Sequence, residues 1–297
     1  MERYFFIVNP ISGSGRARAE FEKVRALLDA RGVTYEVAYT QCPGHAKTLA
    51  EEALAAGYRR VVAVGGDGTV NEAASALVHT DAALAVLPFG TGNDLTRVVR
   101  FPAEPEKAVE TLLEDNVVRM DAGEANGLIF VNVAGLGFDV DVLVKTLKYK
   151  KKHPRGMTPY LLGILDALSH LRTLHLTIEH DGERVKTEGI ILSVGNGQYI
   201  GGGMRAVPMG DPFDGYLDCV YVQKVGVPRF LALLPGFLKG KHIKAPVVHH
   251  FRTRELRVET EEECVLDYDG DLRSSASAVF RVLPGALNVV LPREEAR

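Results

Sequence analysis

The chain has 297 residues, of which 46% are hydrophobic and 25% are charged, and its formal net charge at pH 7 is −3. This is the composition of a soluble globular protein with one large or two ordinary domains, and the small acidic charge argues against a nucleic-acid partner. Three scattered cysteines, the lack of a signal peptide and the absence of any apolar run near 18 residues predict a cytoplasmic protein with no transmembrane segment.

The first part of the chain alternates short apolar strands with helical segments. The expected strands are Tyr4–Val8, Thr34–Thr40, Arg60–Val64 and Ala83–Leu87. The expected helices are Arg16 to about Arg31, Ala46–Ala56 and Val70–Val78. Strands that alternate with helices predict an α/β domain with a parallel sheet covered on both faces.

Three of these strands run directly into glycine-bearing loops, at residues 9–15, 65–69 and 88–94. Glycines at a strand-to-helix turn let backbone N–H groups approach an anion, and the helix N-terminus favours negative charge. In a parallel sheet the ligand binds at the carboxyl ends of the strands, where all three loops fall. The first loop is not a Walker A loop, because no Gly-Lys-Ser/Thr sequence closes it. The three loops together predict a nucleotide phosphate site.

Asp67 stands in the middle loop, where a carboxylate should repel phosphate unless a cation lies between them. Its presence therefore indicates Mg²⁺ bound together with the nucleotide.

The pattern changes near Asp121, where short alternating segments indicate antiparallel strands. The expected strands are Leu128–Val133, Leu174–His180, Val185–Val194, Tyr216–Val222, Glu255–Glu259, Cys264–Asp267, Ala278–Val282 and Leu287–Leu291, interrupted by helices at Pro159–Leu171 and Pro228–Lys239. We expect residues 1–121 to form the α/β domain and residues 122–297 a β-rich, sandwich-like domain. The last strand could return to the first domain, and the sequence does not decide this.

A basic run at Lys145–Arg155 contains six Lys or Arg and no acid. It is open to two interpretations: a solvated loop, or a segment attracted to anionic lipid headgroups, at about 1 kcal/mol per basic residue. The apolar stretch Phe230–Leu238 is a weaker candidate for the same surface, and burial in the core is the favoured interpretation for it.

Five motifs in chain order resemble the diacylglycerol kinase catalytic family, and within it the soluble bacterial lipid kinases. They are NPISG at 9–13, GGDGTVNE at 65–72, PFGTGNDLTR at 88–97, VGNGQYIGGGMRAVP at 194–208 and DPFDGYLD at 211–218. GGDGT alone is shared with NAD kinases, whereas its combination with the other motifs is specific.

The resemblance implies an ATP site and a structural Mg²⁺ site. The implied ATP-binding residues are Asn9, Pro10, Ile11, Ser12, Gly13, Thr40, Gly65, Gly66, Asp67, Gly68, Thr69, Val70, Asn71 and Thr91. The implied Mg²⁺ ligands are Asp211, Asp214 and Tyr216, the last through its backbone carbonyl. Their spacing alone favours a polar β-turn, and the resemblance reverses that preference.

Phosphorylation of an alcohol requires a carboxylate that accepts the hydroxyl proton. The stretch LDYDGDLRS offers Asp267, Asp269 and Asp271. The family pattern here is Asp-Gly-Glu, and this chain has Asp269-Gly270-Asp271, whose last acid is one methylene shorter. We expect Asp271 to be the proton acceptor and Asp269 the second candidate, with Asp67 as a third catalytic acid.

The sequence thus predicts an ATP- and Mg²⁺-dependent lipid kinase that acts on diacylglycerol or a related lipid and contacts the membrane surface peripherally. Two alternatives stay open. One is an NAD kinase-like enzyme with a soluble substrate. The other is a nucleotide-binding protein without catalysis.

Overall fold

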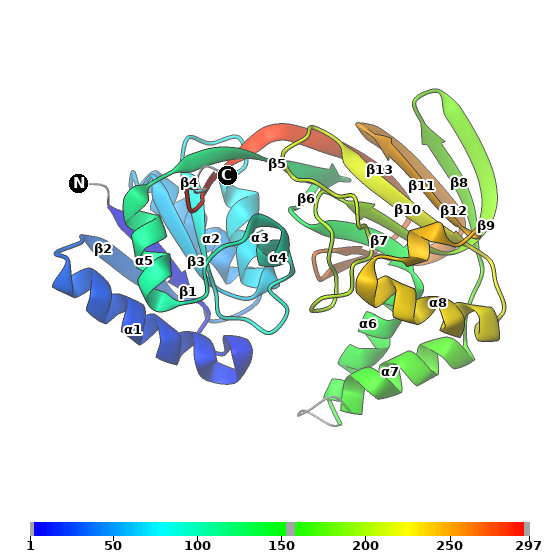
Figure 1. Ribbon diagram of the computed structural model, residues 1–297, viewed down its shortest axis with the longest axis horizontal. Helices are drawn as coiled ribbons and strands as arrows, with labels where there is room; N and C mark the ends of the chain where they lie inside the picture. The colour runs from blue at the N-terminus through cyan, green and yellow to red at the C-terminus, as the bar shows by residue number, and fades with distance from the viewer. Residues whose placement is uncertain (1–2, 153–157, 294–297) are drawn as a thin grey trace.

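The computed structural model describes residues 3–152 and 158–293. Figure 1 shows two halves side by side, with both ends of the chain in the half on the left. That half holds the N-terminal α/β domain, and the right half holds the β-rich part.

The N-terminal domain is built on four parallel strands in the order β2-β1-β3-β4. These are β1 (Tyr4–Val8), β2 (Tyr35–Tyr39), β3 (Arg60–Gly65) and β4 (Ala83–Pro88). The connections contain a 3₁₀ turn, η1 (Ser12–Gly15), and the helices α1 (Arg16–Ala30), α2 (His45–Ala55), α3 (Asp67–Leu77), α4 (Asp94–Val99) and α5 (Pro105–Glu114).

Alternation along the strands builds two separate cores, one on each face of this sheet. Phe6 and Val8 of β1 face the side covered by α1 and α5, whereas Ile7 faces the side covered by α2, α3 and α4. Because both faces are buried there, β1, β3 and β4 are almost entirely apolar, whereas the edge strand β2 is partly exposed and contains Glu36. The predicted parallel sheet with helices on both faces is confirmed.

The second half is antiparallel. Its strands are β6 (Leu128–Phe130), β7 (Val133–Gly137), β8 (Leu174–His180), β9 (Glu183–Gly195), β10 (Leu217–Gln223), β11 (Val248–Thr253) and β12 (Glu255–Tyr268). The long strands bend: β9 pairs with β8 in its first part and with β7 and β10 in its second. The antiparallel, sandwich-like prediction is confirmed, although neither β7 nor β11 was predicted.

Three helices cover one face of this sandwich (Figure 1): α6 (Phe138–Lys150), α7 (Thr158–Ser169) and α8 (Val227–Lys239), followed by the 3₁₀ turn η2 (His242–Lys244). The basic run therefore begins in the last part of α6. Its residues 153–155 lie outside the described residues.

Two strands join the halves. β5 (Val117–Ala125), which was not predicted, pairs antiparallel with β13 (Asp271–Val290) along both domains. The end of β13 then pairs parallel with β4, with Asn288 opposite Ala83. The last strand thus returns to the N-terminal sheet, and the predicted boundary between residues 121 and 122 falls inside β5.

Asp121 ties this crossing together. The backbone N–H of Gly285, in the register shift of β13, donates to Asp121 Oδ1 at 2.7 Å, and the N–H of Gly215 donates to Oδ2 at 2.7 Å. The buried carboxylate therefore holds the crossing strands and the 211–216 loop in one arrangement.

Leu287→Ala should destabilise the N-terminal domain, because Leu287 is fully buried in its core although it lies near the end of the chain. We expect the free energy of unfolding to fall by about 2–5 kcal/mol, the usual cost of a Leu→Ala cavity. Urea denaturation followed by circular dichroism measures this loss. Leu272→Ala, at the far end of β13, is the control; equal losses for the two variants would contradict the assignment of Leu287 to that core.

Candidate functional site

The structure brings the three glycine-bearing loops together at the carboxyl edge of the parallel sheet. Asn9 Nδ2 donates to Thr69 Oγ1 at 3.1 Å, which joins the first loop to the second. A Cβ atom on Gly90 would lie 2.2 Å from the Cα of Gly66, so the second and third loops touch through backbone alone. Gly13, at φ +58°, similarly approaches the carbonyl of Phe89. These contacts admit only glycine, and they leave backbone N–H groups as the lining of the edge.

Asp67 joins the second loop to the third. Its carboxylate accepts hydrogen bonds from the backbone N–H groups of Asn93, at 2.8 Å, and Asp94, at 2.5 Å. These are N-terminal N–H groups of α4, so Asp67 caps that helix from another element. The sequence suggested a cation partner for Asp67 and gave no sign of this cap. Each carboxylate oxygen keeps a further lone pair, so the cap and a cation are compatible.

The remaining predicted nucleotide residues lie around this edge. The N–H of Thr40 donates to the carbonyl of Val8 at 2.9 Å, which places the end of β2 beside the first loop. Glu72 of α3 accepts the N–H groups of Gly44, at 2.8 Å, and Ala46, at 3.0 Å, and so fixes the segment that follows Thr40. Sequence reasoning missed this role of Glu72, because nothing in the order of residues pairs α3 with the start of α2.

Asp94 is a buried carboxylate between the two halves of the molecule. Gly202 N–H, from the GGG loop of the second half, donates to Asp94 Oδ2 at 2.8 Å, and Arg97 Nε lies 3.5 Å from Oδ1. Burial raises the pKa of Asp94 to about 6, aided by the nearby Asp67 charge and opposed by the Gly202 amide and Arg97. Arg97 also donates to the carbonyls of Gly92 and Gly202. The GTGND and GGG motifs therefore form one of the contacts between the domains.

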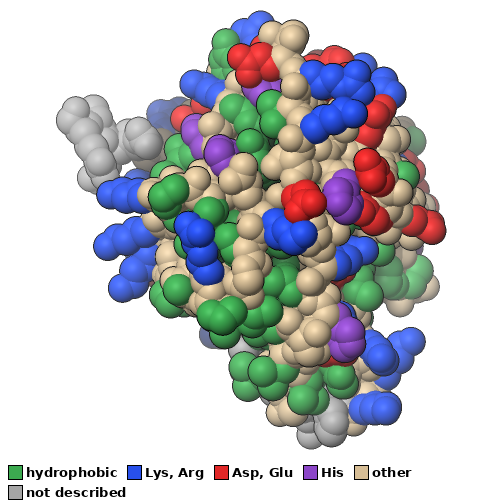
Figure 2. All heavy atoms as spheres, turned by 90° about the vertical axis from the view of Figure 1, so that its right-hand side faces the viewer, with side chains coloured by type: hydrophobic (Ala, Val, Ile, Leu, Met, Phe, Trp, Pro, Cys, Tyr) green, Lys and Arg blue, Asp and Glu red, His purple; other side chains and the backbone are tan. Residues whose placement is uncertain are grey.

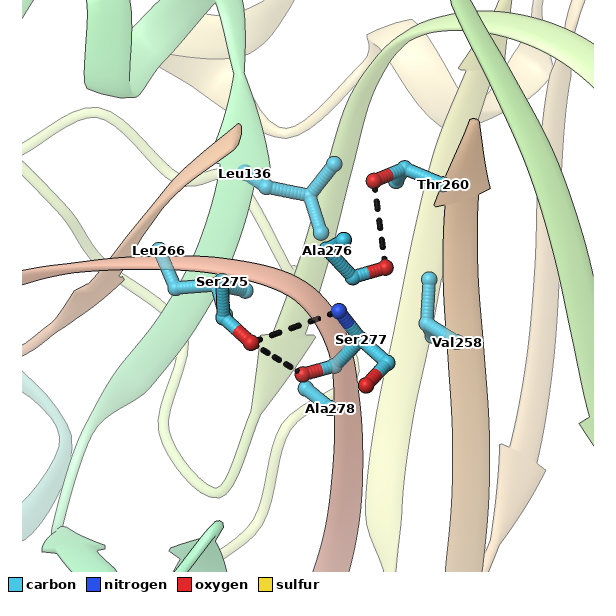
Figure 3. A pocket seen from close by; sticks show the side chains of 8 residues that line it. All are labelled: Leu136, Val258, Thr260, Leu266, Ser275, Ala276, Ser277 and Ala278. Carbon is cyan, nitrogen blue, oxygen red and sulfur yellow. Dashed lines mark hydrogen bonds between the residues drawn. The ribbon is translucent and has the colours of Figure 1, made fainter. Parts of the chain in front are cut away.

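A cavity of about 250 Å³ opens beside the third loop. Its lining is partly polar and partly apolar and includes two arginines: Arg16, Pro88, Gly90, Thr91, Gly92, Asn93, Thr96, Arg97, Phe101 and Ala103. Guanidinium groups match phosphate geometry, so the cavity suits an anionic group next to the predicted nucleotide edge. A second hollow, under the irregular part of β12 and β13, is closed by Leu136, Leu266 and the Ser275–Ser277 turn (Figure 3) and has no space for a water molecule.

The acidic hairpin between β12 and β13 lies in the second half. Asp269, at φ +52°, accepts the backbone N–H groups of Val131 (2.6 Å), Asn132 (3.0 Å) and Val133 (2.9 Å). Removal from water raises the pKa of Asp269 to about 7, against the pull of these three amides. Its carboxylate is thus engaged in holding the turn between β6 and β7.

That turn leads back to the nucleotide edge. Asn71 Nδ2, on α3, donates to the carbonyl of Ile129 in β6 at 3.3 Å, two residues before the turn that Asp269 holds. The predicted ATP-binding helix and the predicted acceptor acids are therefore connected through one short strand.

Asp267 and Asp139 form a pair of perturbed carboxyl groups in the same region. Burial raises the pKa of both to about 7, and the Asp139 charge contributes to the shift at Asp267. Asp139 Oδ1 is buried and has no hydrogen-bond partner among the described residues. Asp271 lies beside them with a half-exposed carboxylate that accepts a bond from Arg273 Nη2 at 3.0 Å. Asp139 was missed, because only the fold brings the start of α6 to this hairpin.

The predicted structural Mg²⁺ loop is an ordered turn. Asp211 accepts the N–H of Phe213 at 3.1 Å, and Asp214 accepts the N–H of Tyr216 at 3.0 Å. Asp214 also forms an ion pair with Arg252, whose guanidinium lies over the Tyr216 ring. Over the described ranges, no three His, Cys, Asp or Glu side chains gather as metal ligands. The oxygen donors suit a hard cation, which would need backbone carbonyls or water in addition.

Comparison with known proteins covers both halves of the chain. Residues 3–125 match the diacylglycerol kinase catalytic domain, and residues 133–291 match the YegS C-terminal NAD kinase beta sandwich-like domain. A diacylglycerol kinase of Bacillus subtilis is 29% identical over 100% of this chain and 98% of its own length. A YegS-like lipid kinase of Pseudomonas aeruginosa is 36% identical, over 91% of this chain and 90% of its own.

Solved structures agree with these matches. A structure described as a diacylglycerol kinase from Bacillus anthracis str. Sterne has a TM-score of 0.80 and 26% identity, and covers 98% of both chains.

Asp94→Asn should change how stability depends on pH. Because the pKa of Asp94 is raised from 3.8 to about 6 on folding, its contribution to stability is complete below pH 4 and is lost as the pH rises through 6. The wild type should therefore lose up to about 3 kcal/mol from this group between pH 4 and 7, and the variant should not. Urea denaturation across this range, with EDTA present, measures the difference. A stability difference that stays constant with pH would contradict the raised pKa.

Proposed function

Because the chain belongs to the diacylglycerol kinase catalytic family, we propose that it is an ATP- and Mg²⁺-dependent lipid kinase. It transfers the γ-phosphoryl group of ATP to the hydroxyl group of diacylglycerol or a related lipid. The observation that carries the proposal is the arrangement of glycine loops on one domain and perturbed carboxyl groups on the other, joined through Asn71 and β6.

The ATP phosphates bind at the edge formed by the three loops. Backbone N–H groups of Gly13 and of residues 66–69, at the N-terminus of α3, stabilise their negative charge, and Thr40 and Thr91 lie at the margins of the site. Glu72 acts indirectly, because it holds the loop after Thr40, and Asp67 helps to hold the third loop in addition to its role toward Mg²⁺. Since the loops touch through glycine backbone, their positions are fixed before the nucleotide binds.

The acceptor hydroxyl binds near the acidic hairpin. Asp271 accepts the hydroxyl proton while the oxygen forms its bond to the γ-phosphorus, and the bond from that phosphorus to ADP breaks. Of the three hairpin acids, Asp269 is engaged by three amides and Asp267 accepts the Gly270 N–H, whereas Asp271 faces outward with one exposed partner. Asp269 then acts as a positioning residue for the β6–β7 turn.

Mg²⁺, when bound, would neutralise phosphate charge, and Asp67 is the residue at the loop edge that would hold it. A second Mg²⁺ in the 211–216 loop would be structural. Through Asp121 it would stiffen the crossing between the domains.

The lipid substrate places the enzyme at the cytoplasmic membrane surface as a peripheral protein. No helix in the described part of the chain is long and apolar enough to cross a bilayer. Lys148, Lys150, Lys151 and Lys152 offer positive charge to anionic headgroups, in keeping with the basic run identified in the sequence.

The test is incubation with labelled ATP, Mg²⁺ and a panel of lipids in mixed micelles, with NAD as a separate acceptor. We expect phosphate transfer to a lipid. Asp271→Asn should reduce turnover about 10²–10⁴-fold with little change in ATP affinity, because the nucleotide is held by the other domain. Asp269→Asn is the variant for comparison. We expect it to lose turnover and, unlike Asp271→Asn, also to lose folding stability.

Three outcomes contradict this proposal. Labelled NADP in place of a lipid product would indicate the NAD kinase alternative. ATP binding without transfer to any acceptor would indicate a non-catalytic nucleotide-binding protein. An active Asp271→Asn together with a stable but inactive Asp269→Asn would make Asp269 the proton acceptor.

Mg²⁺ should raise the melting temperature of the wild type, and Asp211→Asn should remove part of that rise. The reason is linkage, since a cation that binds only the folded loop stabilises it by mass action. In EDTA the two proteins should melt alike, because Asn keeps the bond to the Phe213 N–H. Asp81→Asn, an exposed acid elsewhere, is the control. A Mg²⁺ response unchanged by Asp211→Asn would argue against a cation in this loop.

A further inference from the structure

The helices on the outer face of the second half are apolar on both sides. α8 buries Phe230 and Phe237 against the sandwich, and Phe230 meets Phe138 of α6 edge-on at 4.6 Å between ring centroids. α7 packs against α6 through Gly163, where a Cβ atom would lie 2.5 Å from Thr146 Oγ1. These contacts account fully for the inward faces. A helix that is also apolar on its outward face needs another explanation.

The outward faces carry most of the exposed large hydrophobic side chains found in the described residues. Leu161 and Leu165 of α7 are 56% and 63% exposed, and Leu238 of α8 is 62% exposed. Their spacing is helical, so each helix presents a stripe rather than scattered residues. The set is Val144 and Leu147 on α6, Leu161 and Leu165 on α7, and Val227, Leu231 and Leu238 on α8. We call these seven side chains the leucine face.

Basic side chains border the leucine face. None of Lys148, Lys150, Lys151 or Lys152, at the end of α6, forms an ion pair within the described ranges, and neither do Arg229 and Lys239 on α8. The acid nearest in α7, Asp166, is already paired with Lys145 at 2.5 Å. Figure 2 shows hydrophobic side chains gathered over the lower part of the molecule, with Lys and Arg at the margins.

We propose that the leucine face docks on a bilayer that contains anionic lipid, with its leucines inserted among the lipid chains and the bordering lysines at the headgroups. This deepens the proposed function by naming the surface that meets the membrane. Charge selects this occupant: an anionic surface complements the basic border, whereas a second copy of the chain would bring lysines against lysines. Apolar side chains with a basic rim are the usual composition of a helix that lies in the membrane interface.

α6 connects the leucine face with the acids. It begins at Phe138, beside Asp139, and ends at Lys150, at the bordering lysines. Thirteen residues of α helix span about 20 Å, so the lysines and the acid-bearing start of α6 lie at opposite ends of one helix.

The test uses the full chain and vesicles of phosphatidylcholine with or without phosphatidylglycerol. Leu161→Gln/Leu165→Gln and Leu231→Gln/Leu238→Gln should each lower the partition coefficient about tenfold or more, because each removes two side chains that bury apolar surface in the bilayer. Leu113→Gln, an equally apolar exposed change on α5 of the other domain, is the matched control. Thermal melting checks that every variant is folded.

The salt dependence of vesicle binding distinguishes the contribution of the lysines from that of the leucines. Charge reversal at Lys148 and Lys150 should weaken binding at low salt only, whereas the leucine variants should stay weak at high salt. Activity on a short-chain, water-soluble diacylglycerol should be unchanged in the leucine variants. The wild type could also bind vesicles but phosphorylate no lipid, while the leucine variants lose that binding. This result would overturn the proposed function and support the docking surface.

Two results overturn the docking surface itself. One is a leucine variant that is folded and partitions onto vesicles like the wild type. The other is a change of the wild-type oligomer to a monomer in the leucine variants, by analytical ultracentrifugation, with vesicle binding unaltered. That second result would make the leucine face a contact between copies of this chain.

Discussion

Two antiparallel strands, β5 and β13, carry the backbone between the halves of this molecule, and both halves depend on their pairing. β13 starts in the acidic hairpin, runs the length of the sandwich and ends as a neighbour of β4. A ladder of backbone hydrogen bonds resists twisting more than a flexible linker does, so the acids and the glycine loops are held at a defined separation. The buried Asp121 secures this ladder where its register shifts.

The nucleotide edge is built from backbone rather than from side chains. A Cβ atom on Gly90 would clash with the Cα of Gly66, so these two loops meet through backbone, and the carboxylate of Asp67 spans the same two loops. Side chains would lose conformational entropy when a ligand bound, whereas amides fixed by neighbouring loops do not. The GGDG and PFGTG motifs are therefore in direct contact with each other. A substitution that moves one loop is expected to move the other.

Much of this could be read from the sequence, because it rests on local rules. Apolar runs followed by glycines predicted the parallel strands and the three loops, and alternation predicted the antiparallel half. β5 was not predicted, because Val117–Ala125 mixes charged and apolar residues. It is stabilised by β13, which lies far away in the chain. β11 is a short edge strand with two histidines and has little strand character of its own. The sequence identified the hairpin acids but not their surroundings. Asp269 accepts amides from residues 131–133, and Asp267 lies near Asp139. In both cases the partners are more than a hundred residues apart in the chain.

The return of β13 to the first sheet has a consequence for biosynthesis. The four parallel strands are complete once the first 88 residues have been made, yet the edge of β4 stays unpaired until residues 288 and 289 arrive. An open, apolar strand edge is a template for pairing with other chains. Translation therefore leaves the nascent first domain with one unpaired strand edge until the end of β13 has been made. A chain that stalls before its final strand would be an aggregation risk rather than a smaller working domain.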